Sequence, residues 1–132
     1  MPLVYRAMKR DADGLPHVAP TASGLGVRPN IDIDVDHQGY AVVNHKGMSV
    51  SPSWREISIF RIPKRLGGQG SNRTYCFMMG TGPFQQEALA PGLELVPNSP
   101  THGVVRPEKS VPLHEYEADI AATRSDWQFD EA

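Results

Sequence analysis

The segment that most constrains the fold is Thr101–Pro107, together with the amphipathic stretch that follows it. The segment leaves a proline-rich loop, carries β-forming residues and stops at a proline, which predicts a short buried strand with His102 near its start. Pro112 then stands where a helix can begin, and residues of one face recur at helical spacing. They are Leu113, Tyr116, Ile120, Thr123 and Trp127. We therefore predict a strand followed by a helix that runs from Pro112 to Trp127.

Glycine and proline limit how long the other elements can be. Each contributes 12 residues to a chain of 132. Both interrupt regular structure, so we expect many turns with short strands between them. The chain is long enough for one domain with a hydrophobic core, residues 1–132, and too short for two comfortable ones. With about six or seven short strands and one clear helix, the predicted fold class is α+β.

Shorter patterns predict the other elements. Extended segments are predicted at Leu3–Lys9, Ile31–Asp36, Gly39–Val43, Met48–Pro52, Ile57–Pro63, Thr74–Met79 and Leu93–Val96. Among them, Thr74–Met79 is predicted to be a central strand, with Cys76 buried in it. Phe84–Leu89 is predicted to form one helical turn. Loops or tails are predicted at Leu15–Asn30, Pro97–Pro100 and Phe129–Ala132.

Charge and cysteine content exclude several classes of protein. The formal net charge of −2 gives no overall attraction to nucleic acid or to an anionic membrane. No apolar run approaches the roughly 18 residues of a membrane span, and the N-terminus has no signal-peptide pattern. The single cysteine favours a reducing compartment. We expect a cytoplasmic protein with no membrane or DNA partner, which a dedicated secretion system must carry if it acts in another cell.

Neither the histidines nor the aspartates predict a metal site. The five histidines contain no pair at a recognised ligand spacing, and the lone cysteine has no cysteine partner. The alternation in Ile31–Asp36 is tempting as a calcium loop, but His37 stands where glycine is required and Val43 where glutamate is required. We expect a strand with three aspartates on its solvated face, and no metal cofactor.

A set of polar residues on or beside predicted strands indicates chemistry. The set comprises Arg6, the pair Ser49 and Ser51, and His102 with the trailing Glu108. Arginine holds a diphosphate or a carboxylate through paired donors, serine can align a ribose, and an acid or histidine near a glycosidic carbon can stabilise an oxocarbenium-like transition state. The set suits an enzyme that opens the nicotinamide–ribose bond of NAD⁺.

Three short motifs resemble a known family. Leu3–Ala7, Gly47–Val50 and His102–Pro107, the last ahead of a helix that ends near Trp127, look like the small type VI secretion effector toxins with an ADP-ribosyltransferase-like fold. The resemblance implies two small packed, mostly antiparallel sheets with an NAD cleft between them and a C-terminal helix. It also implies a toxin that acts on a cytoplasmic protein or RNA target and is neutralised by an immunity protein.

By the same resemblance, Arg6 is the motif arginine, Ser49 lies on the serine strand and His102 opens the late strand. NAD would then be bound by Arg6, Ser49, Ser51 and His102. The sequence departs from the wider family because no clear Glu-x-Glu precedes a late strand. Glu87, in a Gln-x-Glu triplet, and Glu108 are the two candidates for the catalytic acid. Whether ADP-ribose is transferred or NAD⁺ is only hydrolysed stays open.

Two other functions are compatible with the residues. One is a non-enzymatic protein-binding module of a phage or secretion system, in which the polar set lies scattered over the surface. The other is a relative of the RNA phosphotransferases, favoured only by the basic, glycine-rich loop Lys64–Arg73, which is either a hairpin tip or a phosphate contact. An enzyme instead needs Arg6, Ser49 and His102 in one cleft with an acid within reach.

Overall fold

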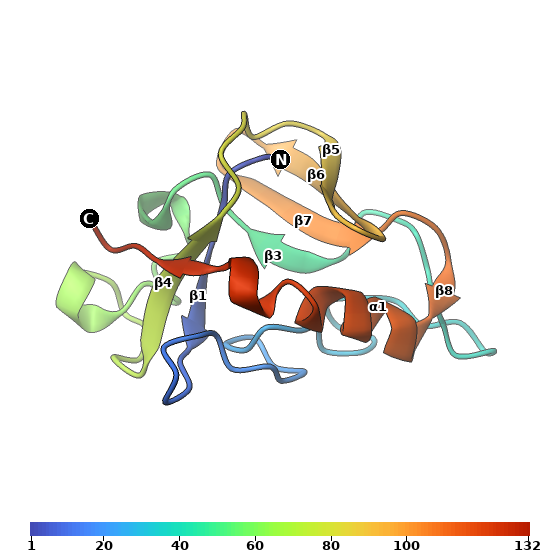
Figure 1. The fold of residues 1–132 in the computed structure, drawn as a ribbon, viewed down its shortest axis with the longest axis horizontal. Coiled ribbons are helices and arrows are strands. Elements are labelled where there is room, and N and C mark those ends of the chain that lie inside the picture. Colours follow the sequence, from blue (N-terminus) through green and yellow to red (C-terminus); the bar gives the residue numbers. More distant parts are fainter.

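The computed structural model describes Met1–Ala132. It is an α+β structure with two main antiparallel sheets and one α-helix near the C-terminus (Figure 1). The strands are β1 Val4–Lys9, β2 Tyr40–Ala41, β3 Met48–Val50, β4 Thr74–Met79, β5 Glu87–Ala90, β6 Leu93–Ser99, β7 His102–Pro107, β8 Val111–Pro112 and β9 Gln128–Phe129. The helix α1 spans Leu113–Ala121, and short 3₁₀ turns lie at Trp54–Glu56, Lys64–Leu66 and Arg124–Asp126. The predicted fold class, α+β with mostly antiparallel sheets, is confirmed.

The two main sheets meet at the N-terminal strand. One sheet has the order β1-β4-β9 and the other the order β3-β7-β6-β5, while β2 and β8 form a separate pair. Tyr5 of β1 and Ser51, directly after β3, exchange backbone hydrogen bonds of 2.7 and 3.0 Å. Because this bridge joins an edge of each sheet, β1 and β3 run close together where the sheets meet. As predicted, Thr74–Met79 is the central strand of its sheet.

The C-terminal helix packs on the core through the face that its sequence predicts. Tyr116, Ile120 and Trp127 are at most 1% exposed. The Tyr116 hydroxyl donates to the Val105 carbonyl at 2.5 Å and accepts from the Met48 amide at 3.3 Å, so it ties α1 to β7 and β3. Burying a tyrosine ring stabilises a core only when its hydroxyl finds such partners.

The helix is nevertheless shorter than predicted. It ends at Ala121, a 3₁₀ turn follows, and Trp127 lies in extended backbone. Thr123 explains the end: its hydroxyl donates to the Ile120 carbonyl at 2.7 Å and accepts from the Trp127 indole N–H at 2.9 Å. A threonine bonded to a preceding carbonyl competes with the helical ladder. Thr123 and Trp127 are buried as their spacing predicts, although both lie beyond the end of the helix.

Two predicted strands are absent because local polar bonds hold the chain in turns. In Ile31–Asp36 each aspartate has its own partner: Asp32 pairs with Arg28, Asp34 pairs with Lys46, and Asp36 accepts backbone N–H groups. In Ile57–Pro63 the carbonyl of Ser58 accepts two turn hydrogen bonds. Alternation in the sequence was therefore a poor guide where side chains bond locally.

Smaller elements also differ from the predictions. Gly39–Val43 contributes only the two residues of β2, and Phe84–Leu89 forms no helical turn because Glu87–Ala90 is strand β5. The predicted loop Pro97–Pro100 largely belongs to β6, which pairs with β7 as far as Ser99. The last two segments become strand because each pairs with the next strand along the chain, which propensity alone does not reveal.

The C-terminal tail is ordered, contrary to the prediction of a frayed end. β9 pairs with β4, the Asp130 carboxylate accepts from the Tyr5 hydroxyl at 2.7 Å, and Glu131 pairs with Arg65 and accepts from the Cys76 amide. Cys76 is buried as predicted. Burial, helped by the nearby Glu131, raises the pKa of its thiol to about 12, so it is a poor nucleophile at neutral pH.

Candidate functional site

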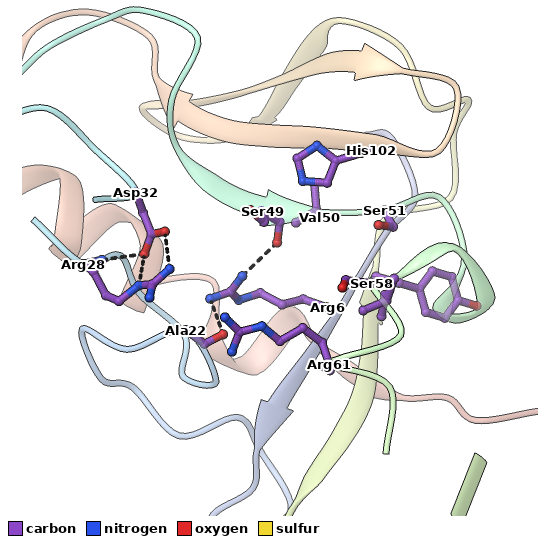
Figure 2. A pocket seen from close by; sticks show the side chains of 13 residues that line it. Arg6, Ala22, Arg28, Asp32, Ser49, Val50, Ser51, Ser58, Arg61 and His102 are labelled. Atoms are coloured by element: carbon purple, nitrogen blue, oxygen red, sulfur yellow. Dashed lines mark hydrogen bonds and ion pairs between the residues drawn. The ribbon is translucent and has the colours of Figure 1, made fainter. Parts of the chain in front are cut away.

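Three predicted residues from three strands line one pocket at the junction of the sheets. Arg6 comes from β1, Ser49 from β3 and His102 from the start of β7 (Figure 2). The pocket encloses about 150 Å³. Its other polar side chains are Arg28, Asp32, Ser51, Ser58 and Arg61. Arg6, Ser49 and His102 therefore lie together in one pocket and are not scattered over the surface.

Strand pairing brings these residues together. Ser49 lies opposite Val104 and Val50 opposite Gly103 in the β3–β7 ladder, so His102 stands just beyond the end of β3. The bridge between Tyr5 and Ser51 then places Arg6, one residue along β1, next to the same edge. The pocket is thus a consequence of the ladder registers and not of one loop.

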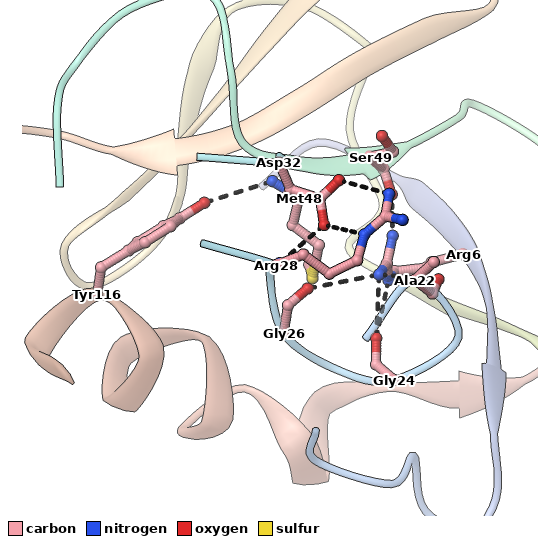
Figure 3. Close-up of polar contacts among 9 residues, drawn as sticks. All are labelled: Arg6, Ala22, Gly24, Gly26, Arg28, Asp32, Met48, Ser49 and Tyr116. Atoms are coloured by element: carbon pink, nitrogen blue, oxygen red, sulfur yellow. Dashed lines mark hydrogen bonds and ion pairs between the residues drawn. The ribbon is translucent and has the colours of Figure 1, made fainter. Parts of the chain in front are cut away.

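Arg6 is a buried cation bound to neutral groups. Its side chain is 7% exposed. The guanidinium donates to the carbonyls of Ala22, Gly24 and Gly26, in a loop of residues 19–26 that we name the glycine-rich loop, and of Ser49 on β3, at 2.9 to 3.4 Å (Figure 3). Burial lowers the pKa of Arg6 to about 10, which still leaves it protonated at neutral pH. No carboxylate pairs with it directly.

The glycines of this loop allow its carbonyls to reach Arg6. A Cβ added to Gly26 would lie 2.3 Å from the Ala19 carbonyl oxygen, and one at Gly24 would lie 2.9 Å from the same atom. The loop therefore folds back on itself more closely than any side chain permits. Its backbone carbonyls approach an internal arginine.

Arg28 and Asp32 form an ion pair on the pocket wall. The Arg28 guanidinium donates to both Asp32 carboxylate oxygens at 2.9 and 3.0 Å, and its backbone N–H donates at 2.8 Å. Burial by itself would raise the pKa of Asp32, but these hydrogen bonds outweigh it and lower the pKa below its usual value. Asp32 is therefore ionised at neutral pH.

His102 is a neutral base at the rim. Its Nδ1 lies 2.9 Å from Asn98 Oδ1. Burial lowers the pKa of the imidazole, so the ring is uncharged at neutral pH. Ser49 and Ser58 are exposed and Ser51 is buried. The pocket thus offers hydroxyl groups and one neutral imidazole beside its charged residues.

The balance of charge in the pocket is positive. Three guanidinium groups, of Arg6, Arg28 and Arg61, face one carboxylate, that of Asp32, which leaves an excess of two positive charges. Arg61 is exposed, and its guanidinium forms no hydrogen bond or ion pair within the chain. A small pocket with excess positive charge and hydroxyl donors is suited to an anion.

Neither predicted catalytic acid lines this pocket. Glu87 lies on β5, which is separated from β3 by two strands, and its carboxylate is 4.0 Å from the N-terminal ammonium. Glu108 is exposed after β7, and its N–H donates to the Gly92 carbonyl. Asp32 is the carboxylate that the pocket contains. Arg28 and Asp32 are four residues apart and pair across a turn, in which the Asp32 N–H also donates to the Arg28 carbonyl.

Outside the pocket we considered metal sites, membrane-spanning helices and the basic loop. No group of three or more histidine, cysteine, aspartate or glutamate residues could hold a metal ion. The α-helix has nine residues, and none of the helical segments has the length and apolar character of a membrane-spanning helix. In the basic loop Lys64–Arg73, the Arg65 guanidinium pairs with Glu131 and donates to the carbonyls of Asn72 and Thr74. The loop is thus partly tied to the body of the protein.

Comparison of the chain with protein-family models, curated proteins and solved structures gave no match. The resemblance to the effector toxins therefore rests on three short motifs. Seven of the thirteen residues that line the pocket lie outside those motifs, among them Asp32 and Arg61. Arg61 had no sequence signal of its own, because its segment was predicted to be a strand.

Proposed function

We propose that this pocket binds the phosphorylated part of NAD⁺ and that the protein consumes NAD⁺, by ADP-ribosyl transfer or by hydrolysis, as a toxin of the resembling kind. One observation carries the proposal: Arg6, Ser49, Ser51 and His102 line a single pocket with an excess of two positive charges. This is the arrangement that an NAD-consuming enzyme needs and a surface module does not.

The residues divide the work by their chemistry. The positive excess attracts the diphosphate and lets guanidinium donors bind its oxygens. The hydroxyl groups of Ser49 and Ser58 suit ribose or phosphate oxygens. Asp32, which stays ionised, supplies the negative charge that stabilises an oxocarbenium-like sugar as the bond to nicotinamide breaks. It takes the place that the sequence offered to Glu87 or Glu108.

The size of the pocket limits what it holds. Its 150 Å³ is below the roughly 300–1,000 Å³ of pockets that enclose a whole drug-sized ligand. We propose that it holds one end of the dinucleotide and that the rest lies outside it. The same limit applies to any other phosphorylated ligand.

Expression in bacteria tests the proposal. Wild-type protein should slow growth and deplete cellular NAD⁺, whereas Ser49→Ala and His102→Ala should relieve both effects by at least about tenfold in rate. Arg73→Gln serves as the control because this exposed arginine lies outside the pocket. Wild-type expression that leaves growth and NAD⁺ unchanged would contradict the proposal, as would toxicity that both pocket variants retain.

A non-enzymatic binding module is the second candidate. Its specific support is the exposed pair Ile59 and Phe60, 49% and 71% exposed, on the segment that also carries Arg61. Exposed apolar side chains of this size are common at protein interfaces. An immunity protein or a target that binds there would be released by Phe60→Asp, while NAD⁺ would stay at its normal level in cells that express the wild type.

A further inference from the structure

Arg61 lies between two pockets. A second pocket of about 190 Å³ adjoins the first, and both are lined by Ala7 and Arg61. The polar side chains of the second pocket, besides Arg61, are Lys9, Ser23, Ser71 and Thr74. No carboxylate lines it, so Lys9 and Arg61 give it a positive charge that no group in the pocket balances.

The backbone fixes Arg61 while its side chain stays free. The Arg61 and Ile62 amides donate to the Ser58 carbonyl at 2.8 and 3.1 Å, and the Ile62 carbonyl accepts from the Gly70 amide at 2.7 Å. Ile62 is 8% exposed and anchors the segment in the interior. A donor group on a held backbone loses less freedom on binding than one on a mobile loop.

Arg6 is unsuited to the role that the motif assigns to it. Its donors are directed to the carbonyls of the glycine-rich loop and of Ser49, and turning them to a ligand would leave buried carbonyl groups without partners. The Arg61 guanidinium forms no such hydrogen bonds. The two arginines lie close enough that Arg61 lowers the pKa of Arg6 after the larger effect of burial.

We infer that Arg61 is the principal ligand-binding cation and joins two anion subsites, so that the preferred ligand carries two adjacent anionic groups, as a diphosphate does. One group binds in the first pocket beside Ser49 and Ser58, and the other binds in the second pocket beside Lys9. The inference rests on the proposed function in that it uses the same pocket. It adds a second subsite and two residues, Arg61 and Lys9, that the motifs do not contain.

Calorimetric titration of the full chain with inorganic phosphate and with pyrophosphate tests this inference. Wild-type protein should bind pyrophosphate at least about tenfold more tightly than phosphate, because two subsites are engaged in place of one. Arg61→Gln should weaken both ligands by about tenfold or more. Lys9→Gln should weaken pyrophosphate several-fold, roughly the effect of one lost charge contact, and leave phosphate within about twofold.

Controls separate binding from folding. Arg73→Gln removes an exposed charge outside both pockets and should leave both affinities within about twofold. Arg61→Lys keeps the charge but not the paired donors, so it should recover only part of the affinity. Circular dichroism should show the same folded spectrum for all four variants, since Lys9, Arg61 and Arg73 are exposed.

The outcomes distinguish the inference from the function. Equal wild-type affinity for the two probes, or Arg61→Gln binding as the wild type does, overturns the two-subsite inference and leaves NAD⁺ binding through the first pocket in place. Failure of the wild type to bind either probe overturns both. The predicted binding pattern in a protein that does not deplete NAD⁺ supports the two subsites and contradicts NAD⁺ consumption.

Discussion

Arg6 and Arg61 line the same pocket and differ in almost every other respect. Arg6 is buried on a strand and its guanidinium is bound by loop carbonyls, whereas Arg61 is exposed on a turn and its guanidinium is free. The cost of leaving water is offset for Arg6 by several charge-assisted hydrogen bonds. An arginine in a binding motif can thus serve the framework while a neighbour outside the motif faces the ligand.

The largest expected difference between the two arginines is in stability. Arg6→Ala should lower the free energy of unfolding by about 3 kcal/mol or more, because it leaves several buried carbonyl groups without donors. Arg61→Ala should change it by no more than about 0.5 kcal/mol, since the side chain is exposed and unbonded. Urea denaturation of both variants measures this, and equal losses would break the distinction between framework and ligand residues.

A second test disturbs the loop that Arg6 holds without touching the arginine. Gly26→Ala should cost about 2 kcal/mol, because the new Cβ would meet the Ala19 carbonyl and move the loop away from Arg6. Ser23→Ala, in the same loop, keeps the backbone path and should cost less than about 0.5 kcal/mol. If thermal unfolding shows no difference between the two variants, then close packing at Gly26 is not what holds the loop carbonyls against Arg6.

The resemblance and the patterns predicted the framework better than the site. β1, β3, β4 and β7 lie where their sequences place them, because each is short, apolar on one face and ended by glycine, proline or a turn. The buried face of the C-terminal helix could also be predicted from its sequence. These features depend on local sequence, whereas the convergence of Arg6, Ser49 and His102 was expected only from the family resemblance and results from the ladder registers.

What could not be predicted depends on which partners the polar side chains and strand edges find, some nearby and some far along the chain. The alternation of Ile31–Asp36 did not reveal that Arg28 and Lys46 would take up its carboxylates. The apolar composition of Ile57–Pro63 predicted a strand, but the segment forms a turn in which Phe60 and Arg61 are exposed. Glu87 lies on β5, and two strands separate β5 from the serine strand β3. Only the order of strands in the sheet reveals this separation.

The smallest expected effect concerns His102 and pH. Burial lowers the pKa of its imidazole in the folded protein below the unfolded value near 6.5. The unfolded chain therefore binds more protons in that window, so stability should fall slightly as the pH drops from about 7.5 to about 5.5. His102→Gln should reduce this dependence, as urea denaturation at the two pH values would show.

Protonation of His102 should lower stability slightly but raise the affinity of the pocket for anions. A charged His102 adds to the positive charge of the pocket, so sulfate, whose own charge stays constant, should bind more tightly at about pH 5.5 than at about pH 7.5. His102→Gln should remove this gain. Sulfate affinity that does not change with pH, or that changes equally in the variant, would place His102 outside the reach of the ligand.

The most direct measurement is a crystal structure of the protein with pyrophosphate bound. We predict one phosphoryl group beside Ser49 or Ser58 and the other beside Lys9, with the Arg61 guanidinium in contact with both and Arg6 still bonded to the carbonyls of the glycine-rich loop. Pyrophosphate bound elsewhere would contradict the account. So would an Arg6 that leaves those carbonyls to hold the ligand while Arg61 stays in solvent.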